Sequence, residues 1–198
     1  MKTTKEIGAE LESAFAKYMK DELGYSSTKQ NVYVQGKLAK QSIEVDVHGI
    51  IKNKFYENIK TLGYLIIVIA CVQLFLGIIP EVEVALENLF TSISPRLAGC
   101  SLLIFGALGI YIGLTGSKNS IEHTWVECKN MKSKVTRNHI ATLSDNVIDH
   151  NQQYENVKEK GEDVWFAKKM IFVSKSGFND DALNRATDKG IICYLWNG

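Results

Sequence analysis

Three residues, Asp46, Glu127 and Lys129, have the chemical types and the spacing that suit metal-assisted hydrolysis of a phosphodiester. Residues 43–48 alternate apolar and polar side chains, which predicts a strand that presents Asp46 on the face opposite to its core residues. Residues 125–129 alternate in the same way, so Glu127 and Lys129 are expected to project together from a second strand. The sequence thus predicts one carboxylate on one strand and a carboxylate with an ammonium group on another.

The strand pattern also assigns the neighbours of Asp46 to faces. Its core face is expected to carry Ile43, Val45 and Val47, and its polar face Glu44, Asp46 and His48. We interpret Glu44 as an exposed neighbour and not as a ligand. His48 is interpreted as a structural or surface residue, and a role near the substrate phosphate is the alternative.

The predicted chemistry is that of a metal-dependent hydrolase. Asp46, Glu127 and the backbone carbonyl of Cys128 would supply hard oxygen ligands, which suit Mg²⁺ or Mn²⁺. Lys129 would orient or help to deprotonate the attacking water, and it would stabilise negative charge on the phosphate. The alternative is that the two carboxylates are solvated strand residues. Their shared facing and the accompanying Lys129 favour the metal site.

The elements that must position these residues follow from periodicity and turn residues. Residues 5–22 have apolar side chains at helical spacing and are expected to form a helix, with Gly24 at its C-cap position. Residues 135–148 are expected to form a helix with one apolar side, which carries Val135, Ile140, Leu143, Val147 and Ile148. Residues 178–190 are expected to contain a helix that opens at Asn179 or Asp180. The predicted order is helix, three strands, helix, strand, helix and strand, in residues 5–22, 31–38, 42–51, 122–130, 135–148, 164–174, 178–190 and 191–196.

Two apolar runs, residues 62–79 and 97–115, carry no charged side chain. Each is close to the roughly 20 residues that cross about 30 Å of hydrocarbon as a helix. A buried hairpin in a soluble core is the alternative, but neither run has the polar stripe of such a helix. Lysines flank the pair and the connecting segment is net acidic, so both flanks and both termini are expected in the cytoplasm. Without an ionisable residue inside either run, the hairpin is expected to be an anchor and not a channel.

The domain organisation follows from these runs. We expect residues 1–59 and 118–198 to form two parts of one α/β domain, interrupted by a transmembrane hairpin over residues 60–117. Neither flank is large enough to bury a good core by itself. The four cysteines have no CxxC spacing and are expected to be reduced, and the charged N-terminus lacks the apolar core of a signal peptide. The net charge of +1 permits a polyanionic partner without requiring one.

A family resemblance rests on Asp46 followed by Glu127-Cys128-Lys129 on the next strand. This pattern resembles the PD-(D/E)xK nuclease signature, with valines around the aspartate and no preceding proline. Residues 171–196 resemble the closing strand-helix-strand of the Mrr-like restriction endonuclease branch. The start, Gly8-Ala9-Glu10-Leu11-Glu12, is similar to that branch and to archaeal Holliday junction resolvases.

The resemblance covers nearly all of the chain outside residues 60–117, and it implies a restriction-endonuclease-like αβββαβ core. It also implies that Glu12, rather than Glu10, assists metal binding, while a plain surface acid is the alternative reading of Glu12. The departure from the family is the hairpin inserted between the aspartate strand and the ExK strand, which implies a nuclease domain held at a membrane.

The sequence therefore predicts a membrane-anchored, Mg²⁺-dependent endonuclease on the cytoplasmic face of the inner membrane. Its expected substrate is nucleic acid, and DNA is favoured over RNA. The resemblance also implies a role in defence against foreign DNA. One alternative is a catalytically silent scaffold of the same fold that binds DNA or a protein partner. Another is a membrane sensor in which a homo-oligomeric hairpin switches the nuclease on. Three basic residues after the third strand suit phosphate contacts or a solvated helix start, namely Lys132, Lys134 and Arg137.

Overall fold

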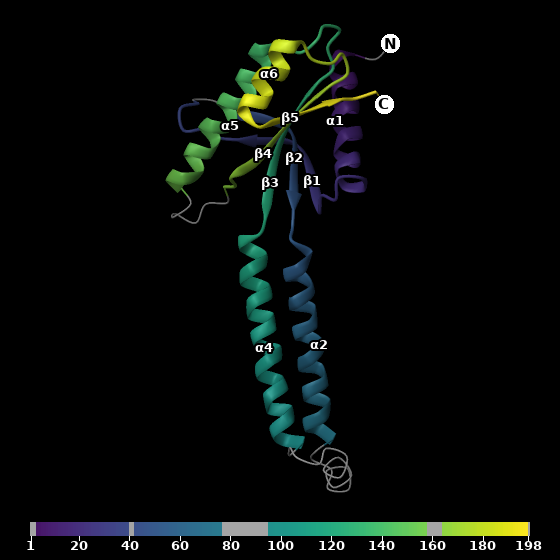
Figure 1. The fold of residues 1–198 in the computed structure, drawn as a ribbon, viewed down its shortest axis with the longest axis vertical. Helices are drawn as coiled ribbons and strands as arrows, with labels where there is room; N and C mark the ends of the chain where they lie inside the picture. Colours follow the sequence, from purple (N-terminus) through teal and green to yellow (C-terminus); the bar gives the residue numbers. More distant parts are fainter. Residues whose placement is uncertain (1–2, 40–41, 77–94, 158–163, 198) are drawn as a thin grey trace. The chain divides into compact units, whose positions relative to one another are not determined.

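The computed structural model describes residues 3–39, 42–76, 95–157 and 164–197. The chain divides into two compact units, which we describe separately (Figure 1). Residues 1–52 and 122–198 form the first unit, here called the sheet domain, and residues 53–121 form the second, the helical hairpin. The helical hairpin is inserted in the sequence between the second and third strands of the sheet domain.

The sheet domain has the predicted order of helices and strands. It contains α1 (Thr4–Asp21), β1 (Ser27–Val34), β2 (Ile43–Ile51), β3 (Glu122–Lys129), α5 (Arg137–Val157), β4 (Ala167–Ser174), α6 (Asp180–Lys189) and β5 (Ile191–Leu195). The first strand begins before the predicted residue 31, and the fourth begins after the predicted residue 164. The α/β class inferred from the sequence is therefore confirmed.

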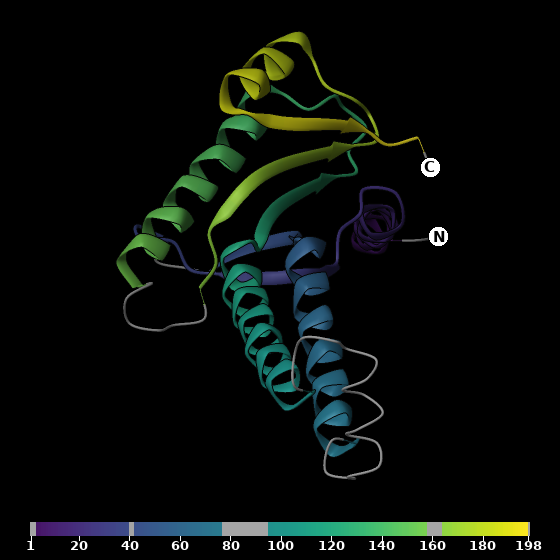
Figure 2. The same ribbon diagram turned by 60° about the horizontal axis from the view of Figure 1, so that its bottom comes forward.

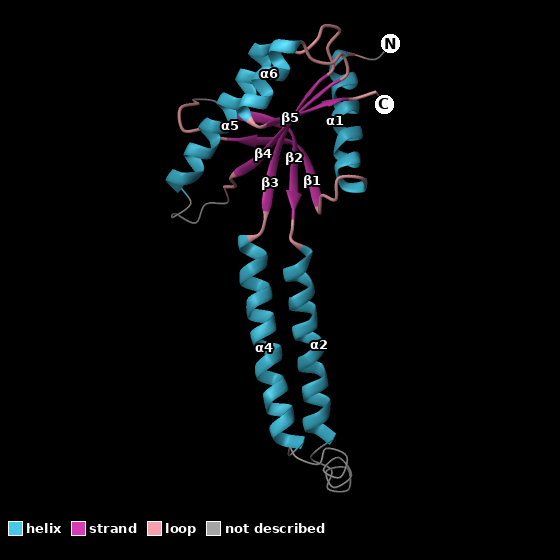
Figure 3. Ribbon diagram, in the orientation of Figure 1, coloured by secondary structure: helices cyan, strands magenta, loops and turns pink. Residues whose placement is uncertain are grey.

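The strands form one mixed sheet in the order β1-β2-β3-β4-β5, shown in magenta in Figure 3. The pairs β1/β2 and β2/β3 are antiparallel, whereas β3/β4 and β4/β5 are parallel. Parallel neighbours need a crossover connection, and α5 and α6 supply the two crossovers. The antiparallel half of the sheet contains both strands that carry the predicted catalytic residues.

Helices cover both faces of the sheet, with α1 on one side and α5 and α6 on the other (Figure 1 and Figure 2). The cluster beneath α1 joins Leu11, Phe15 and Met19 of this helix to sheet residues that include Val47, Val126, Ile171 and Val173. On the other side lies a second cluster, which includes Val45, Trp125, Ile140, Leu143, Val147, Phe172 and Ala186. Strands covered on both faces bury apolar residues in both directions, so simple alternation of apolar and polar residues describes them incompletely.

Local signals set the ends of two helices. Thr3 caps α1 by a capping box, in which its side chain accepts from the Glu6 N–H and the Glu6 carboxylate accepts from the Thr3 N–H. Asn179 is the N-cap of α6, which resolves the choice between Asn179 and Asp180. The C-cap of α1 is Glu22 and not the predicted Gly24, which adopts a positive φ two residues later.

One residue of α5 departs from the expected apolar side. Ile148 is 44% exposed, whereas Ile140, Leu143 and Val147 are buried. Consecutive helical residues are rotated by about 100° around the axis, so Ile148 turns away when its neighbour Val147 faces the sheet. The prediction that Ile148 belongs to the buried side was wrong.

The helical hairpin consists of α2 (Lys54–Leu76) and α4 (Pro95–Asn119). The last residues of the first apolar run, 77–79, lie outside the described residues. Both helices are long and apolar enough to cross a membrane, with segments at 54–75 and 98–117 that each have a mean hydropathy of 1.8. Only 11% and 17% of these segments are buried, which is the opposite of what a hairpin in a soluble core would show.

Glycines lie along the contact between α2 and α4. A Cβ atom at Gly63 would lie 2.8 Å from the Gly106 carbonyl oxygen, and one at Gly113 would lie 2.6 Å from the Lys60 Cβ. Only glycine permits so close an approach of two helix backbones. The glycines of α4 thus lie against α2, while Ala107 is exposed.

Candidate active site

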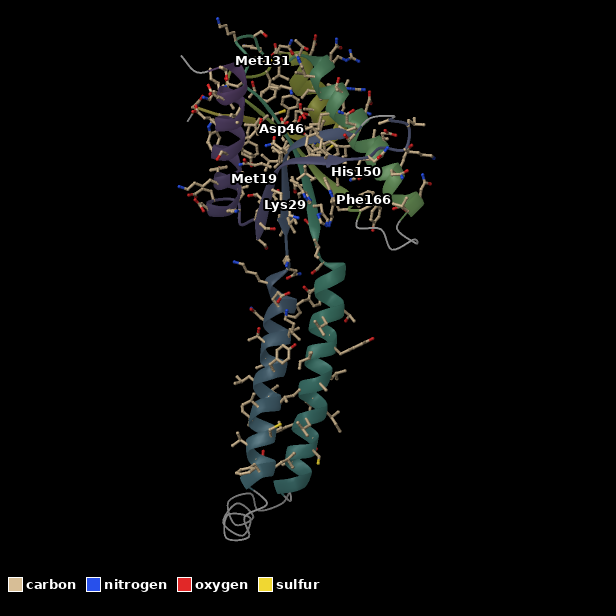
Figure 4. All side chains as sticks on the ribbon, turned by 180° about the vertical axis from the view of Figure 1, so that it is seen from behind. Met19, Lys29, Asp46, Met131, His150 and Phe166 are labelled. Carbon is tan, nitrogen blue, oxygen red and sulfur yellow. The ribbon has the colours of Figure 1, made fainter. Side chains whose placement is uncertain are left out.

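Strands β2 and β3 bring Asp46 and Glu127 to the same part of the sheet. Val47 is paired with Val126 in the antiparallel ladder, and on the same side of this pair Asp46 precedes Val47 on β2 while Glu127 follows Val126 on β3. The Cys128 N–H donates a hydrogen bond of 2.7 Å to Oδ2 of Asp46. Figure 4 shows Asp46 within the sheet domain, on the part of the sheet near α1. The two predicted carboxylates therefore lie on adjacent strands, as a shared site requires.

Glu127 and Lys129 project together from β3. The Nζ atom of Lys129 lies 2.5 Å from Oε1 of Glu127. The alternate residues, Val126 and Cys128, are buried in the cluster beneath α1. Alternation along β3 thus places the carboxylate and the ammonium group side by side, as the sequence predicts.

The alternation of β2 fails at Asp46. Val45 is buried in the cluster on the α5 and α6 side, whereas Val47 is buried in the cluster beneath α1. Opposite this point on β1 is Asn31, which lies between the pairs Gln30–Val47 and Val32–Val45 and has a φ of 50°. Asparagine tolerates this left-handed conformation better than most residues. The prediction that Val45 and Val47 share a face was wrong, because the pairing of β1 with β2 is irregular at Asp46, which lies between them.

The surroundings of Asp46 oppose its ionisation. Burial, followed by the negative charge of Glu127, raises the pKa of Asp46 from 3.8 to about 6. The hydrogen bond from Cys128 and the charge of Lys129 lower this pKa, but they do not cancel the increase. A bound cation would relieve the repulsion between the two carboxylates, so the site is electrostatically suited to one.

The surroundings of Lys129 have the opposite effect. Burial alone would lower its pKa, but the attraction of Glu127 and then of Asp46 raises it above the ordinary value. Lys129 is therefore an ammonium group at neutral pH. This charge suits the stabilisation of a phosphate and the orientation of a water molecule, and it disfavours a role in taking up a proton.

Helix α1 contributes Glu12 to the same region. Burial raises the pKa of Glu12, the charges of Asp46 and Glu44 raise it further, and Lys129 lowers it. The Asn130 side chain holds α1 to the end of β3 by donating a hydrogen bond of 3.0 Å to the Ile7 carbonyl oxygen. Glu12 thus lies within electrostatic reach of Asp46.

The donor set fits Mg²⁺ or Mn²⁺ by its chemistry. Burial raises the pKa of the Cys128 thiol, which stays protonated and is not a metal ligand. The Cys128 N–H faces Asp46, and in an extended strand the N–H and C=O of one residue point to the same side, so its carbonyl faces Asp46 too. Among the described residues, no three His, Cys, Asp or Glu side chains gather as a metal-binding group. Two carboxylates and a carbonyl match Mg²⁺, which completes its shell with water and substrate phosphate.

A cluster of histidine and tryptophan rings is the feature that sequence reasoning missed. His48 is only 4% exposed, its ring stacks on Trp165 at 4.0 Å, and its Nε2 lies 2.9 Å from Nδ1 of His123. From α5, the His150 ring contacts Trp165, and its Nε2 lies 2.7 Å from the Trp165 carbonyl oxygen. His48 is buried among these rings and does not lie on an exposed polar face, so we assign it a structural role. No motif or spacing connects these four residues in the sequence.

The ring cluster predicts an acid-sensitive fold. Burial, followed by the charges of His123, Lys29 and His150, lowers the pKa of His48 from 6.5 to about 4, so the folded protein holds His48 neutral. The unfolded chain takes up this proton first, and stability is lost as the pH falls from about 6.5 towards 4. At pH 5 the loss should be about 1–2 kcal/mol after allowance for partial solvation.

Denaturant unfolding at pH 7 and pH 5 measures this effect in the wild type and in His48→Phe. The variant should lose less stability than the wild type between the two pH values. Equal losses in the two proteins would show that His48 does not contribute to acid sensitivity.

The basic residues after β3 lie on the surface. Lys132, Lys134 and Arg137 are exposed, and they follow Lys129 directly in the chain. Their exposure agrees with both interpretations, phosphate contact and a solvated helix start.

Comparisons with known proteins identify no family. No protein-family model matches the sequence, and no curated protein matches it. A crystal structure described as a protein of unknown function, AF1548, is similar with a TM-score of 0.46 and 14% sequence identity. The match covers 95% of this chain and 58% of the other, so the chain spans little more than half the length of that protein.

Proposed function

We propose that this protein is a membrane-anchored, Mg²⁺- or Mn²⁺-dependent endonuclease with a restriction-endonuclease-like core. It would hydrolyse phosphodiester bonds of nucleic acid, and DNA is the favoured substrate. The observation that carries this proposal is the convergence of Asp46, Glu127 and Lys129 on adjacent strands. Two carboxylates that repel each other beside a charged lysine are costly to the fold, and a site for a cation and a phosphate gives them a role.

Each residue has a separate role in this proposal. Asp46 and Glu127, with the Cys128 carbonyl, would hold the cation, and Glu12 would orient a water molecule near it. When bound, the cation would supply Lewis acidity and neutralise charge on the phosphate. Lys129 would place its ammonium group against the phosphate oxygens as negative charge develops there.

The helical hairpin would anchor this activity in the inner membrane, with both termini in the cytoplasm. Its length and composition support a membrane span, and the lysines of its flanks support the orientation. A cytoplasmic nuclease held at the membrane would meet DNA that enters the cell. Defence against foreign DNA is the biological role that this placement favours.

The test is a cleavage assay with the full chain purified in detergent. Single- and double-stranded DNA and RNA are incubated with Mg²⁺, Mn²⁺ or EDTA. We expect cutting that requires the metal and falls by about 10²-fold or more in Glu127→Gln, since a metal ligand is lost. The exposed Asp188 on α6 provides the control, because Asp188→Asn removes one carboxylate outside the site.

Failure of folded wild-type protein to cut any substrate with any metal would favour the silent scaffold. The anchor is tested separately by extracting membranes with alkaline carbonate. The chain should stay in the membrane pellet, and its release into the supernatant would contradict a spanning hairpin.

A further inference from the structure

The two edges of the sheet differ in their protection against strand addition. On the β1 edge, Lys29 is exposed and Asn31 interrupts the regular strand with a φ of 50°. Charges and irregularities of this kind prevent edge strands from pairing with other chains. The β5 edge, Ile191–Leu195, contains neither a charged residue nor proline, and Ile192 and Leu195 are 46% and 56% exposed. It therefore lacks the protection of the β1 edge.

The outward backbone groups of β5 can be identified from one hydrogen bond. The Trp196 N–H donates to the Ser174 carbonyl oxygen at 2.9 Å, so it faces β4. Alternation along the strand then directs the N–H and C=O groups of Ile191, Cys193 and Leu195 away from β4. In the part of the chain that the structure describes, no strand pairs with this outer side.

We propose that β5 pairs with β5 of a second copy of this chain, antiparallel and about a two-fold axis at Cys193. The outward residues are symmetric about this position, so Cys193 lies opposite Cys193 of the second copy and Ile191 lies opposite Leu195. Every outward N–H meets an outward C=O in this register, as in the hydrogen-bonded pairs of an antiparallel ladder. A two-fold interface of this kind is closed and gives a dimer, not a fibre.

Charge on the neighbouring helix fits the same arrangement. Helix α6 packs on β5 and carries Asp180 and Asp181 in its first turn, whereas its C-terminal half carries Arg185, Asp188 and Lys189, with one more positive than negative charge. The two-fold axis makes the two copies of α6 antiparallel, which turns the acidic end of each towards the basic end of the other. Opposite charges at opposing helix ends are favourable.

The expected dimer is weak in solution. A five-residue strand buries far less than the roughly 1,600 Å² of a standard interface. Confinement of two anchored copies to one membrane would raise their effective concentration and favour pairing. The membrane placement comes from the proposed function, but the strand pairing itself does not depend on cleavage.

Sedimentation of the full chain in detergent over a range of concentrations tests the proposal. We expect a reversible dimer whose dissociation constant rises at least about tenfold in Ile192→Lys/Leu195→Lys. Tyr33→Lys/Leu38→Lys is the matched control, because it adds the same charge at two exposed apolar residues elsewhere. A monomer at all concentrations, or equal weakening by both double variants, would overturn the proposal.

Oxidative crosslinking of the dimer tests the register. In Cys71→Ala/Cys100→Ala, Cys193 and the buried Cys128 are the remaining thiols. The Cα atoms of the two Cys193 residues would be about 5.5 Å apart, within the range of a disulfide. The crosslink should form and should disappear when Cys193→Ala is added. A dimer without this crosslink would overturn the pairing, whether or not the protein cleaves nucleic acid.

Discussion

Replacing Asp46 with asparagine is expected to slow metal-dependent cleavage severely and, at the same time, to stabilise the metal-free fold at neutral pH. The loss of cleavage should be about 10³-fold, because several kcal/mol of metal-assisted stabilisation disappear with the ligand. The gain in stability arises because the folded protein resists ionisation of this carboxyl group. Asparagine retains an oxygen that can accept the hydrogen bond from the Cys128 N–H.

The pH dependence of this gain has a defined sign. The pKa of Asp46 is raised from 3.8 to about 6 in the fold, so the unfolded chain releases this proton more readily. The wild type therefore loses stability as the pH rises from about 4 to 6, by up to about 3 kcal/mol. The advantage of Asp46→Asn should be complete above pH 6 and should vanish near pH 4.

Denaturant unfolding in EDTA, at pH 7.5 and pH 4, measures both proteins under these conditions. Addition of Mg²⁺ at pH 7.5 should stabilise the wild type more than Asp46→Asn, because only the wild type keeps both carboxylates. A variant that is less stable than the wild type at pH 7.5 in EDTA would contradict the assigned electrostatics.

Replacing Lys129 with methionine is expected to slow cleavage by about 10²–10³-fold, the usual cost of removing one group that stabilises transition-state charge. Binding of Mn²⁺ should not weaken, since the variant frees Glu127 from its ion pair and leaves two carboxylates without a neutralising charge. Titration with Mn²⁺, followed by cleavage at saturating metal, separates these two effects. Lys129→Arg keeps the charge and should retain more activity than Lys129→Met.

A matched control lies at the other end of the same strand. Lys168 forms an ion pair with Glu122, at the first residue of β3, and its side chain is exposed. Lys168→Met therefore removes a lysine paired to β3 without touching the site, and it should cleave as the wild type does. If Lys129→Met lost Mn²⁺ binding and cleavage together, Lys129 would be maintaining the site and not acting on the phosphate.

The sequence was sufficient to predict the elements and much of the site. Helical spacing and strand alternation predict the order of elements, and the alternation around Glu127 predicts its pairing with Lys129. These features depend on residues close together in the chain. The meeting of Asp46 with Glu127 was inferred from two strands and a family resemblance, and the antiparallel pairing of β2 with β3 supplies it.

Other features depend on contacts that the sequence does not encode locally. The positive φ of Asn31 arises in the pairing of β1 with β2, and the neighbouring residues do not predict a break in the strand at this position. The stacking of His48 on Trp165 joins residues more than one hundred positions apart. Alternation alone could not assign Val45 and Val47 to opposite faces, because both faces of the sheet bury apolar residues.

The insertion of the helical hairpin between β2 and β3 also fixes the order in which the candidate site is synthesised. Asp46 leaves the ribosome before residues 53–121, and Glu127 and Lys129 leave it after them. A nascent chain that has not yet completed both apolar helices therefore contains only part of the charged centre. Translation thus delays assembly of the site until the whole hairpin has been made, so a prematurely terminated chain cannot carry it.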